Sequence, residues 1–158
     1  MDVYRIRDIL KTNIFAPENA SHPLKQSAFT ELIIRLHDLL QKCCNSKVPV
    51  RFTDDVDIMP EVNDVTNLVA KIRSAVCHIT SKTHQIFEDG GKFTFNTIYG
   101  SGVLAEIGDV QVKNNFADDV CFFFGKYRIY PNRHITRAFT EAKANLIPLT
   151  EYPSQLFD

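Results

Sequence analysis

Apolar residues recur at three- and four-residue steps in four segments of the chain, which predicts four amphipathic helices. These segments span residues 3–15, 28–43, 63–79 and 135–146. Ser27 precedes the second and clearest stripe, and its hydroxyl is expected to cap that helix by accepting a hydrogen bond from a free amide of the first turn. Asn63 or Asp64 is expected to cap the third helix in the same way.

Between the third and fourth helical segments the pattern changes to the alternation that is typical of strands. Residues 93–99 alternate bulky apolar with smaller or polar side chains, which predicts one strand. Residues 120–130, VCFFFGKYRIY, place two β-branched and aromatic runs around Gly125 and Lys126, as a β-hairpin would. The intervening residues 103–119 leave two possibilities open, a further strand or a loop.

Together these elements predict a mainly α, α+β protein whose helices carry the core. A small antiparallel sheet at about 92–130 is expected as an insertion before the last helix. Prolines at 17, 23, 49 and 60 interrupt the helical pattern, so residues 15–26 and 45–62 are expected to be loops. Residues 1–150 are expected to form a single domain and residues 151–158 a tail.

Composition narrows the class of protein. The 158 residues are 44% hydrophobic and 23% charged, close to the globular average, and no apolar run has the length of a membrane span. The net charge of -1 argues against nonspecific coating of nucleic acid, so any contact with RNA must be local. The four cysteines, Cys43, Cys44, Cys77 and Cys121, lack metal-binding spacing and are expected to be reduced thiols of a cytoplasmic protein.

The third helical segment carries a pair of residues that could perform chemistry. Arg73 and His78 are five positions apart, and on an ideal helix they diverge by roughly 140°. One straight helix therefore cannot direct both side chains at one point, but a second copy of the chain could complete the pair. A two-fold interface would place two Arg73 and two His78 side chains along one shared cleft.

This segment resembles a known family. Arg73-Ser-Ala-Val-Cys-His78 is similar to the R-x4-6-H motif of the HEPN superfamily, whose members are small helical domains. The resemblance implies an antiparallel HEPN-like helical bundle that acts as a metal-independent endoribonuclease or binds RNA in toxin–antitoxin, antiviral or RNA-processing systems. Family members often have Asn, Asp or His after the arginine, where this chain has Ser74, a hydroxyl that can still form a hydrogen bond.

The implied chemistry needs no metal and no cofactor, because RNA supplies its own nucleophile in the 2′-hydroxyl. A neutral His78 can accept the proton of that hydroxyl near pH 7. The guanidinium of Arg73 can bind the scissile phosphate and stabilise its charge in the transition state. Arg73, His78 and Ser74 are therefore the predicted catalytic residues, and the expected product is a 2′,3′-cyclic phosphate.

A second candidate site lies in the segment KYRIYPNRHITR. Lys126, Arg128, Arg133, His134 and Tyr130 place cations beside an aromatic ring, which is the composition of a surface for single-stranded RNA. A solvated hairpin with tyrosines in the core is the alternative for the same residues.

The acidic residues Asp54, Asp55 and Asp57 are expected to form a solvated loop, with a lesser possibility that one of them orients His78.

The expected function is thus a homodimeric endoribonuclease in a toxin–antitoxin or antiviral defence system, with RNA as substrate and an antitoxin or other defence protein as a possible partner. The alternative is a non-catalytic module or regulatory subunit that binds RNA or a protein. Cleavage of mixed RNA in EDTA would separate the two.

Overall fold

The computed structural model describes residues 2–77, 95–107 and 110–149 of the chain. Within these ranges it contains four α-helices, a three-stranded sheet and a two-stranded sheet. The helices are α1 (Asp2–Lys11), α2 (Lys25–Asn45), α3 (Val65–Cys77) and α4 (Arg137–Leu146). The strands are β1 (Phe95–Tyr99), β2 (Gly102–Ile107), β3 (Val110–Asn114), β4 (Val120–Phe124) and β5 (Tyr127–Ile129).

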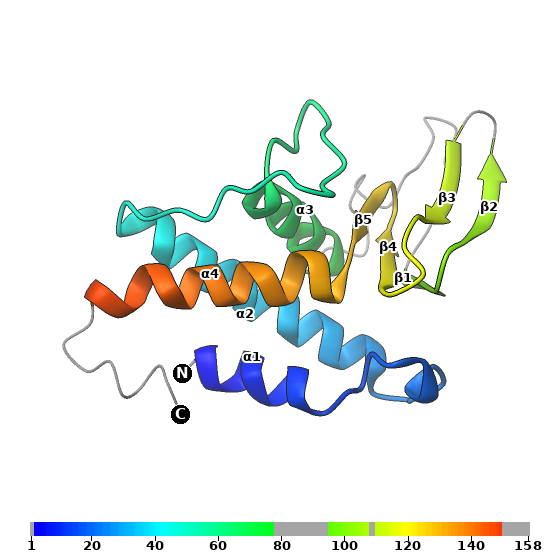
Figure 1. Ribbon diagram of the computed structural model, residues 1–158, viewed down its shortest axis with the longest axis horizontal. Coiled ribbons are helices and arrows are strands. Elements are labelled where there is room, and N and C mark those ends of the chain that lie inside the picture. The colour runs from blue at the N-terminus through cyan, green and yellow to red at the C-terminus, as the bar shows by residue number, and fades with distance from the viewer. Residues whose placement is uncertain (1, 78–94, 108–109, 150–158) are drawn as a thin grey trace.

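Helix α2 lies at the centre of the helical part, and α1, α3 and α4 pack around it (Figure 1). Its predicted apolar stripe is buried along the whole helix, which explains why three other helices gather on it. The buried residues of α2 are Phe29, Leu32, Ile33, Leu36, Leu39, Leu40 and Cys43. The apolar periodicity thus predicted the existence of α2 correctly, and it also predicted which residues face inward.

The predicted helix caps had different outcomes. The prediction for Ser27 was wrong, because α2 already begins at Lys25 and Ser27 is an exposed residue of its first turn. At α3 the prediction was right. Asp64 is buried, and its Oδ1 accepts a hydrogen bond from the backbone N–H of Asn67 at 2.8 Å.

The predicted hairpin is confirmed as the antiparallel pair β4 and β5, with Gly125 in the turn at a φ of 56°. That left-handed conformation favours glycine, which has no Cβ to clash with the backbone. β1 pairs with the other edge of β4, and the strand order is β1-β4-β5. The segment whose structure was left open forms a second hairpin of β2 and β3, which lies beside this sheet (Figure 1).

One face of the three-stranded sheet belongs to the main core. Phe122 and Phe124 of β4 pack with Phe95 of β1 against Phe29 of α2, and ring centroids are 4.7 Å apart for Phe29 and Phe122. Phe15, in the loop after α1, meets Phe122 edge-on at 5.3 Å. The sheet and the helices therefore share a single aromatic cluster.

This packing corrects the expected fold. The described chain is α+β, about 52% helix and 19% strand, and it shows no antiparallel helical bundle. The helices supply most of the core, as expected, but strand alternation in β4 also directs Phe122 and Phe124 into the same interior as α2. The sheet is an integral layer of the core and not an insertion at its surface.

The opposite face of the sheet buries a smaller cluster. Cys121 and Phe123 of β4 pack there with Val112 of β3 and Tyr130, so the β2–β3 hairpin covers this face. Asn114 is buried at the hairpin end, where its Nδ2 donates to the backbone oxygen of Asp119 at 2.8 Å.

None of the described helices is both long enough and apolar enough to span a membrane. All four cysteines are free, and Cys43 and Cys121 are buried. Burial raises the pKa of the Cys43 thiol to about 11, which keeps it protonated at neutral pH.

Candidate functional site

Arg73 lies on the flank of α3, one turn before the last described residue of that helix, Cys77. The helix buries one apolar stripe, including Leu68, Val69 and Ile72, so Arg73 sits at the edge of the core and is half-buried. Ser74 is also half-buried beside it. The sequence thus predicted the placement of Arg73 at the border of the apolar stripe.

Arg73 differs from the other arginines in its partners. Within the described parts of the chain, every other arginine has a carboxylate oxygen within ion-pair distance, and Arg73 has none. The Nε atom of Arg73 is buried and has no hydrogen-bond partner among the described residues. A partly buried cation is stabilised by a counterion, and none of the carboxylates in residues 2–77, 95–107 and 110–149 fills that place at Arg73.

His78, the proposed partner of Arg73, lies outside the described residues, directly after the end of α3. Of the three predicted catalytic residues, the structure therefore describes Arg73 and Ser74.

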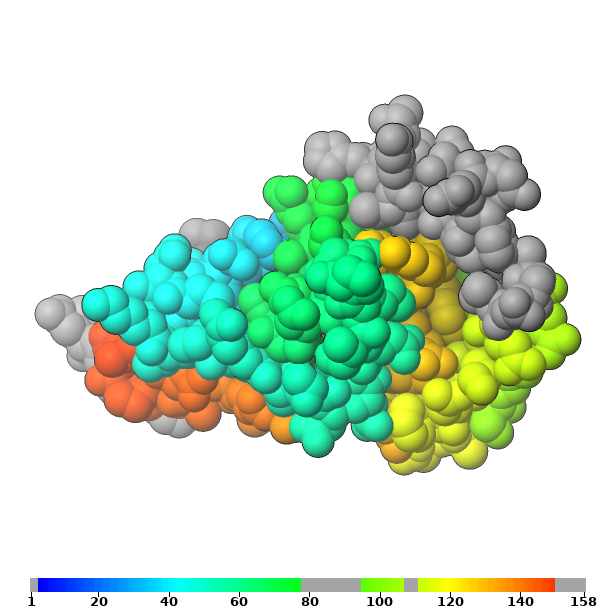
Figure 2. Space-filling view, turned by 90° about the horizontal axis from the view of Figure 1, so that it is seen from above, coloured from blue at the N-terminus to red at the C-terminus, as the bar shows by residue number. Residues whose placement is uncertain are grey.

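The second candidate site, the basic segment of residues 126–137, has its cations in ion pairs within the chain. The acidic loop of residues 54–61 lies against β5 and the start of α4 (Figure 2). Its carboxylates pair with Arg137 and with three of the cations that were expected to bind RNA. The pairs are Asp54–Arg137, Asp55–Arg133, Asp57–Arg128 and Glu61–Lys126. We call these four pairs the loop clamp.

Arg128 is the most enclosed cation of the loop clamp, with a side chain only 13% exposed. Its Nη2 donates to Asp57 at 2.5 Å and its Nη1 to the backbone oxygen of Lys113 at 2.9 Å. Arg128 therefore joins the acidic loop to β3, and these contacts occupy both of its terminal nitrogens.

Arg133 and Arg137 each combine ion pairs with an aromatic contact. The guanidinium of Arg133 lies 3.8 Å from the ring centroid of Phe116 and pairs with Asp118 at 3.0 Å. The guanidinium of Arg137 lies 3.9 Å from the ring centroid of Phe52. Both cations thus have aromatic and carboxylate partners within the chain.

Two of the predicted RNA-binding residues are buried in the interior. Tyr130 and His134 both have 0% exposed surface, so neither side chain can stack on a base or contact a phosphate in this structure. The backbone N–H of Tyr130 donates to Nδ1 of His134 at 3.2 Å. Desolvation lowers the pKa of His134 to about 4, and the ring is therefore neutral at pH 7.

The expectation of a solvated loop holds for Asp54 and Asp55, which are exposed, whereas Asp57 is half-buried. The sequence pattern did not predict that each of the three carboxylates pairs with a cation far along the chain. Local patterning could identify both charged segments, but it contains no information that they meet. The only available signal was their opposite charge.

Glu61 completes the loop clamp by a hydrogen-bonded contact. Its Oε1 accepts hydrogen bonds from Lys126 and, at 2.8 Å, from the hydroxyl of Tyr127. The hydrogen bond from Lys126 has the larger effect on the Glu61 carboxyl, and together with that from Tyr127 it lowers the pKa of this group to about 2. The carboxylate therefore remains charged down to strongly acidic pH.

The neutral state of His134 predicts a pH dependence of stability. The unfolded chain binds a proton at this residue below about pH 6.5, whereas the folded chain binds it only below about pH 4. The unfolded state thus holds more protons between these values, so the free energy of unfolding falls as the pH is lowered through this window, by up to about 3 kcal/mol.

The measurement is urea denaturation of the chain and of its His134→Gln variant from pH 4 to pH 8. Glutamine keeps an acceptor for the Tyr130 N–H but does not titrate. Between pH 6.5 and pH 4 the free energy of unfolding is expected to fall less for the variant than for the unaltered chain. An equal fall in the two proteins would contradict a buried neutral His134 ring.

Among the described residues, no group of three or more histidine, cysteine, aspartate or glutamate side chains is placed to hold a metal ion. The chain matches no known protein family, no curated protein and no solved structure.

Proposed function

We propose that the chain is a metal-independent endoribonuclease in which Arg73 binds the scissile phosphate and His78 moves the proton. The observation that carries this proposal is the half-buried guanidinium of Arg73, which has no carboxylate partner among the described residues. The resemblance of residues 73–78 to the R-x4-6-H motif supports the same assignment. In this proposal Ser74, the next residue along α3, supplies a supporting hydrogen bond.

In this mechanism the attacking group is the 2′-hydroxyl of the substrate. His78 accepts its proton while the oxygen attacks the adjacent phosphorus. The bond to the 5′-oxygen of the next nucleotide breaks, and that oxygen takes up a proton from water as it leaves. Arg73 donates two parallel hydrogen bonds to the phosphate oxygens, which stabilise the charge of the transition state. The products are a 2′,3′-cyclic phosphate and a 5′-hydroxyl.

We further propose that two copies of the chain form the active site. Positions 73 and 78 diverge by roughly 140° on an ideal helix, and a two-fold axis near the end of α3 would bring Arg73 of each copy toward the substrate. Sedimentation at micromolar concentration tests this arrangement, and a monomeric active enzyme would contradict it.

The function is tested by incubating the purified chain with mixed RNA in EDTA. Cleavage is expected to continue with the metal chelated and to leave 2′,3′-cyclic phosphate ends, which are identified by mass spectrometry. A His78→Ala variant prepared in the same way controls for contaminating nucleases, since it removes the proposed base. Cleavage that requires a divalent metal, or that leaves 5′-phosphate ends, would overturn the proposal.

A role as a toxin or in antiviral defence follows from the same chemistry. Expression of the chain is then expected to slow growth, and Arg73→Ala is expected to relieve this effect.

The second candidate function is a non-catalytic module that binds a protein. The loop clamp favours it, because ion pairs within the chain already engage the cations Lys126, Arg128, Arg133 and Arg137. Such a module would leave RNA uncut in the EDTA assay. A partner recovered with the chain would then be expected to bind equally well to the Arg73→Ala variant.

A further inference from the structure

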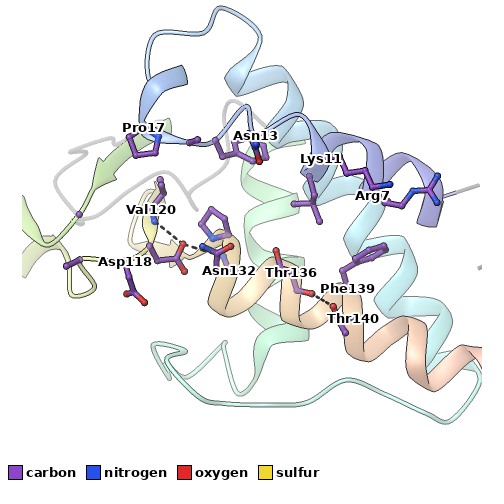
Figure 3. A pocket seen from close by; sticks show the side chains of 17 residues that line it. Arg7, Lys11, Asn13, Pro17, Asp118, Val120, Asn132, Thr136, Phe139 and Thr140 are labelled. Carbon is purple, nitrogen blue, oxygen red and sulfur yellow. Dashed lines mark hydrogen bonds between the residues drawn. The ribbon is translucent and has the colours of Figure 1, made fainter. Parts of the chain in front are cut away.

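A cavity of about 620 Å³ opens on a part of the surface to which α3 does not contribute. It lies between the C-terminal half of α1, the loop that follows α1, the β3–β4 loop and the start of α4, and Arg73 is not among its lining residues (Figure 3). Cavities of this size hold small organic ligands.

One end of the cavity is cationic. Arg7 and Lys11 stand one helical turn apart on α1 and both line it (Figure 3). The Nε of Arg7 is buried without a hydrogen-bond partner, and its nearest carboxylate is that of Asp8, 3.6 Å away and outside the cavity lining. Lys11 is exposed and forms no ion pair with any described carboxylate. Two cations with unused donors attract a group that carries more than one negative charge.

The side wall carries groups suited to a sugar and a flat ring. Thr136 and Thr140 place hydroxyls there, and Asn132 adds an amide (Figure 3). The Oγ1 of Thr140 donates to the backbone oxygen of Thr136 at 2.9 Å, which leaves its lone pairs free to accept. Phe139 and Pro131 supply the apolar surface.

The acidic end of the cavity lies opposite the cations. Figure 3 shows Asp118 at the far side from Arg7 and Lys11. The neighbouring Asp119 is fully buried and accepts hydrogen bonds from backbone N–H groups, including those of Val120 and Arg133. A ligand with its anion at Arg7 and Lys11 would thus keep that anion away from both carboxylates.

We propose that this cavity binds a nucleoside monophosphate, either free or as the 5′-terminal nucleotide of a strand. The phosphate is held by Arg7 and Lys11, the ribose faces Thr136 and Thr140, and the base packs on the wall around Phe139. A phosphate dianion matches two cations better than a single carboxylate does, and the hydroxyl-bearing wall matches a ribose. The proposal rests on residues that the ribonuclease mechanism does not use, so either can fail without the other.

The test is isothermal titration calorimetry on the full chain. The probes are AMP, GMP, adenosine, inorganic phosphate, and a 2′-O-methyl trinucleotide with or without a 5′-phosphate, which the proposed nuclease cannot cleave. Saturable binding of at least one nucleotide is expected, with adenosine and phosphate each at least tenfold weaker than the nucleotides. Preference for AMP or GMP over the 5′-phosphorylated trinucleotide identifies a free nucleotide, and the reverse preference identifies a strand end.

Two substitutions locate the binding. Lys11→Gln is expected to weaken nucleotide binding about tenfold or more, as the loss of a charge-assisted hydrogen bond does. Lys47→Gln removes the same charge from an exposed lysine outside the cavity and is expected to leave binding unchanged. Thr140→Phe fills the cavity from an exposed position without altering charge and is expected to block binding.

No saturable binding of any nucleotide would overturn the proposal. Equal effects of Lys11→Gln and Lys47→Gln would overturn it as well, because they would show a general response to net charge. If inorganic phosphate bound as tightly as AMP and GMP, the cavity would recognise only the anion, and the proposal of a nucleotide site would be rejected.

Discussion

The Arg73→Ala variant is expected to cleave RNA at least about 100-fold more slowly than the unaltered chain. The guanidinium is proposed to stabilise negative charge that grows in the transition state, so its loss should lower kcat more than it raises KM. The measurement is the initial rate of cleavage of a labelled RNA at saturating and at limiting concentration, in EDTA. Arg73 has no carboxylate partner among the described residues, so its removal leaves no described acid unpaired and should not unfold the protein.

Two further variants make this result specific. Arg73→Lys keeps the charge but loses the two parallel donors, and it is expected to recover only a small part of the activity. Arg51→Ala removes an arginine whose side chain is 67% exposed, and it should cleave at the normal rate. Unchanged cleavage by Arg73→Ala, with the Arg51→Ala control also active, would reject the assignment of Arg73.

The Phe122→Ala variant is expected to lose about 3–5 kcal/mol of unfolding free energy, because Phe122 is fully buried between α2 and the sheet. If the sheet is an integral layer of the core, the helices must lose stability together with it. Urea denaturation followed by far-ultraviolet circular dichroism, which reports mainly on the helices, measures this effect.

Phe116→Ala provides the matched control for this core substitution. Phe116 is half-buried on the opposite face of the sheet, beside Arg133, and its removal is expected to cost about 1–2 kcal/mol. A Phe122→Ala variant whose helical transition stayed at the urea concentration of the unaltered chain would contradict the shared core. It would restore the view of the sheet as a separate insertion.

The elements themselves could largely be predicted from local patterns. The stripe of α2, the cap at Asp64 and the turn at Gly125 each depend on a few neighbouring residues, and each prediction was correct. The start of α2 was missed because Lys25 and Gln26 are good helix formers that extend the helix ahead of the apolar stripe.

The candidate RNA surface was less predictable. Its residues form one cluster in the sequence, but strand alternation and the irregular helical turn of residues 131–136 bury His134 and Tyr130. Arg128 and Arg133 meet acids that lie more than 70 residues earlier in the chain. Pairing at such separation depends on how loops are laid over the core, which a local pattern does not encode.

By itself, the sequence determined the helices, the hairpin and the position of Arg73 at the border of an apolar stripe, because each follows from the spacing of nearby side chains. Only the tertiary structure decided that the aromatic face of β4 joins the helical core and that the acidic loop neutralises the basic segment. The cavity at Arg7 and Lys11 likewise exists only in the folded chain, because segments distant in the sequence line it. These three features arise from contacts between distant segments, and the free energy that selects such contacts comes from burial and charge pairing in the folded chain as a whole.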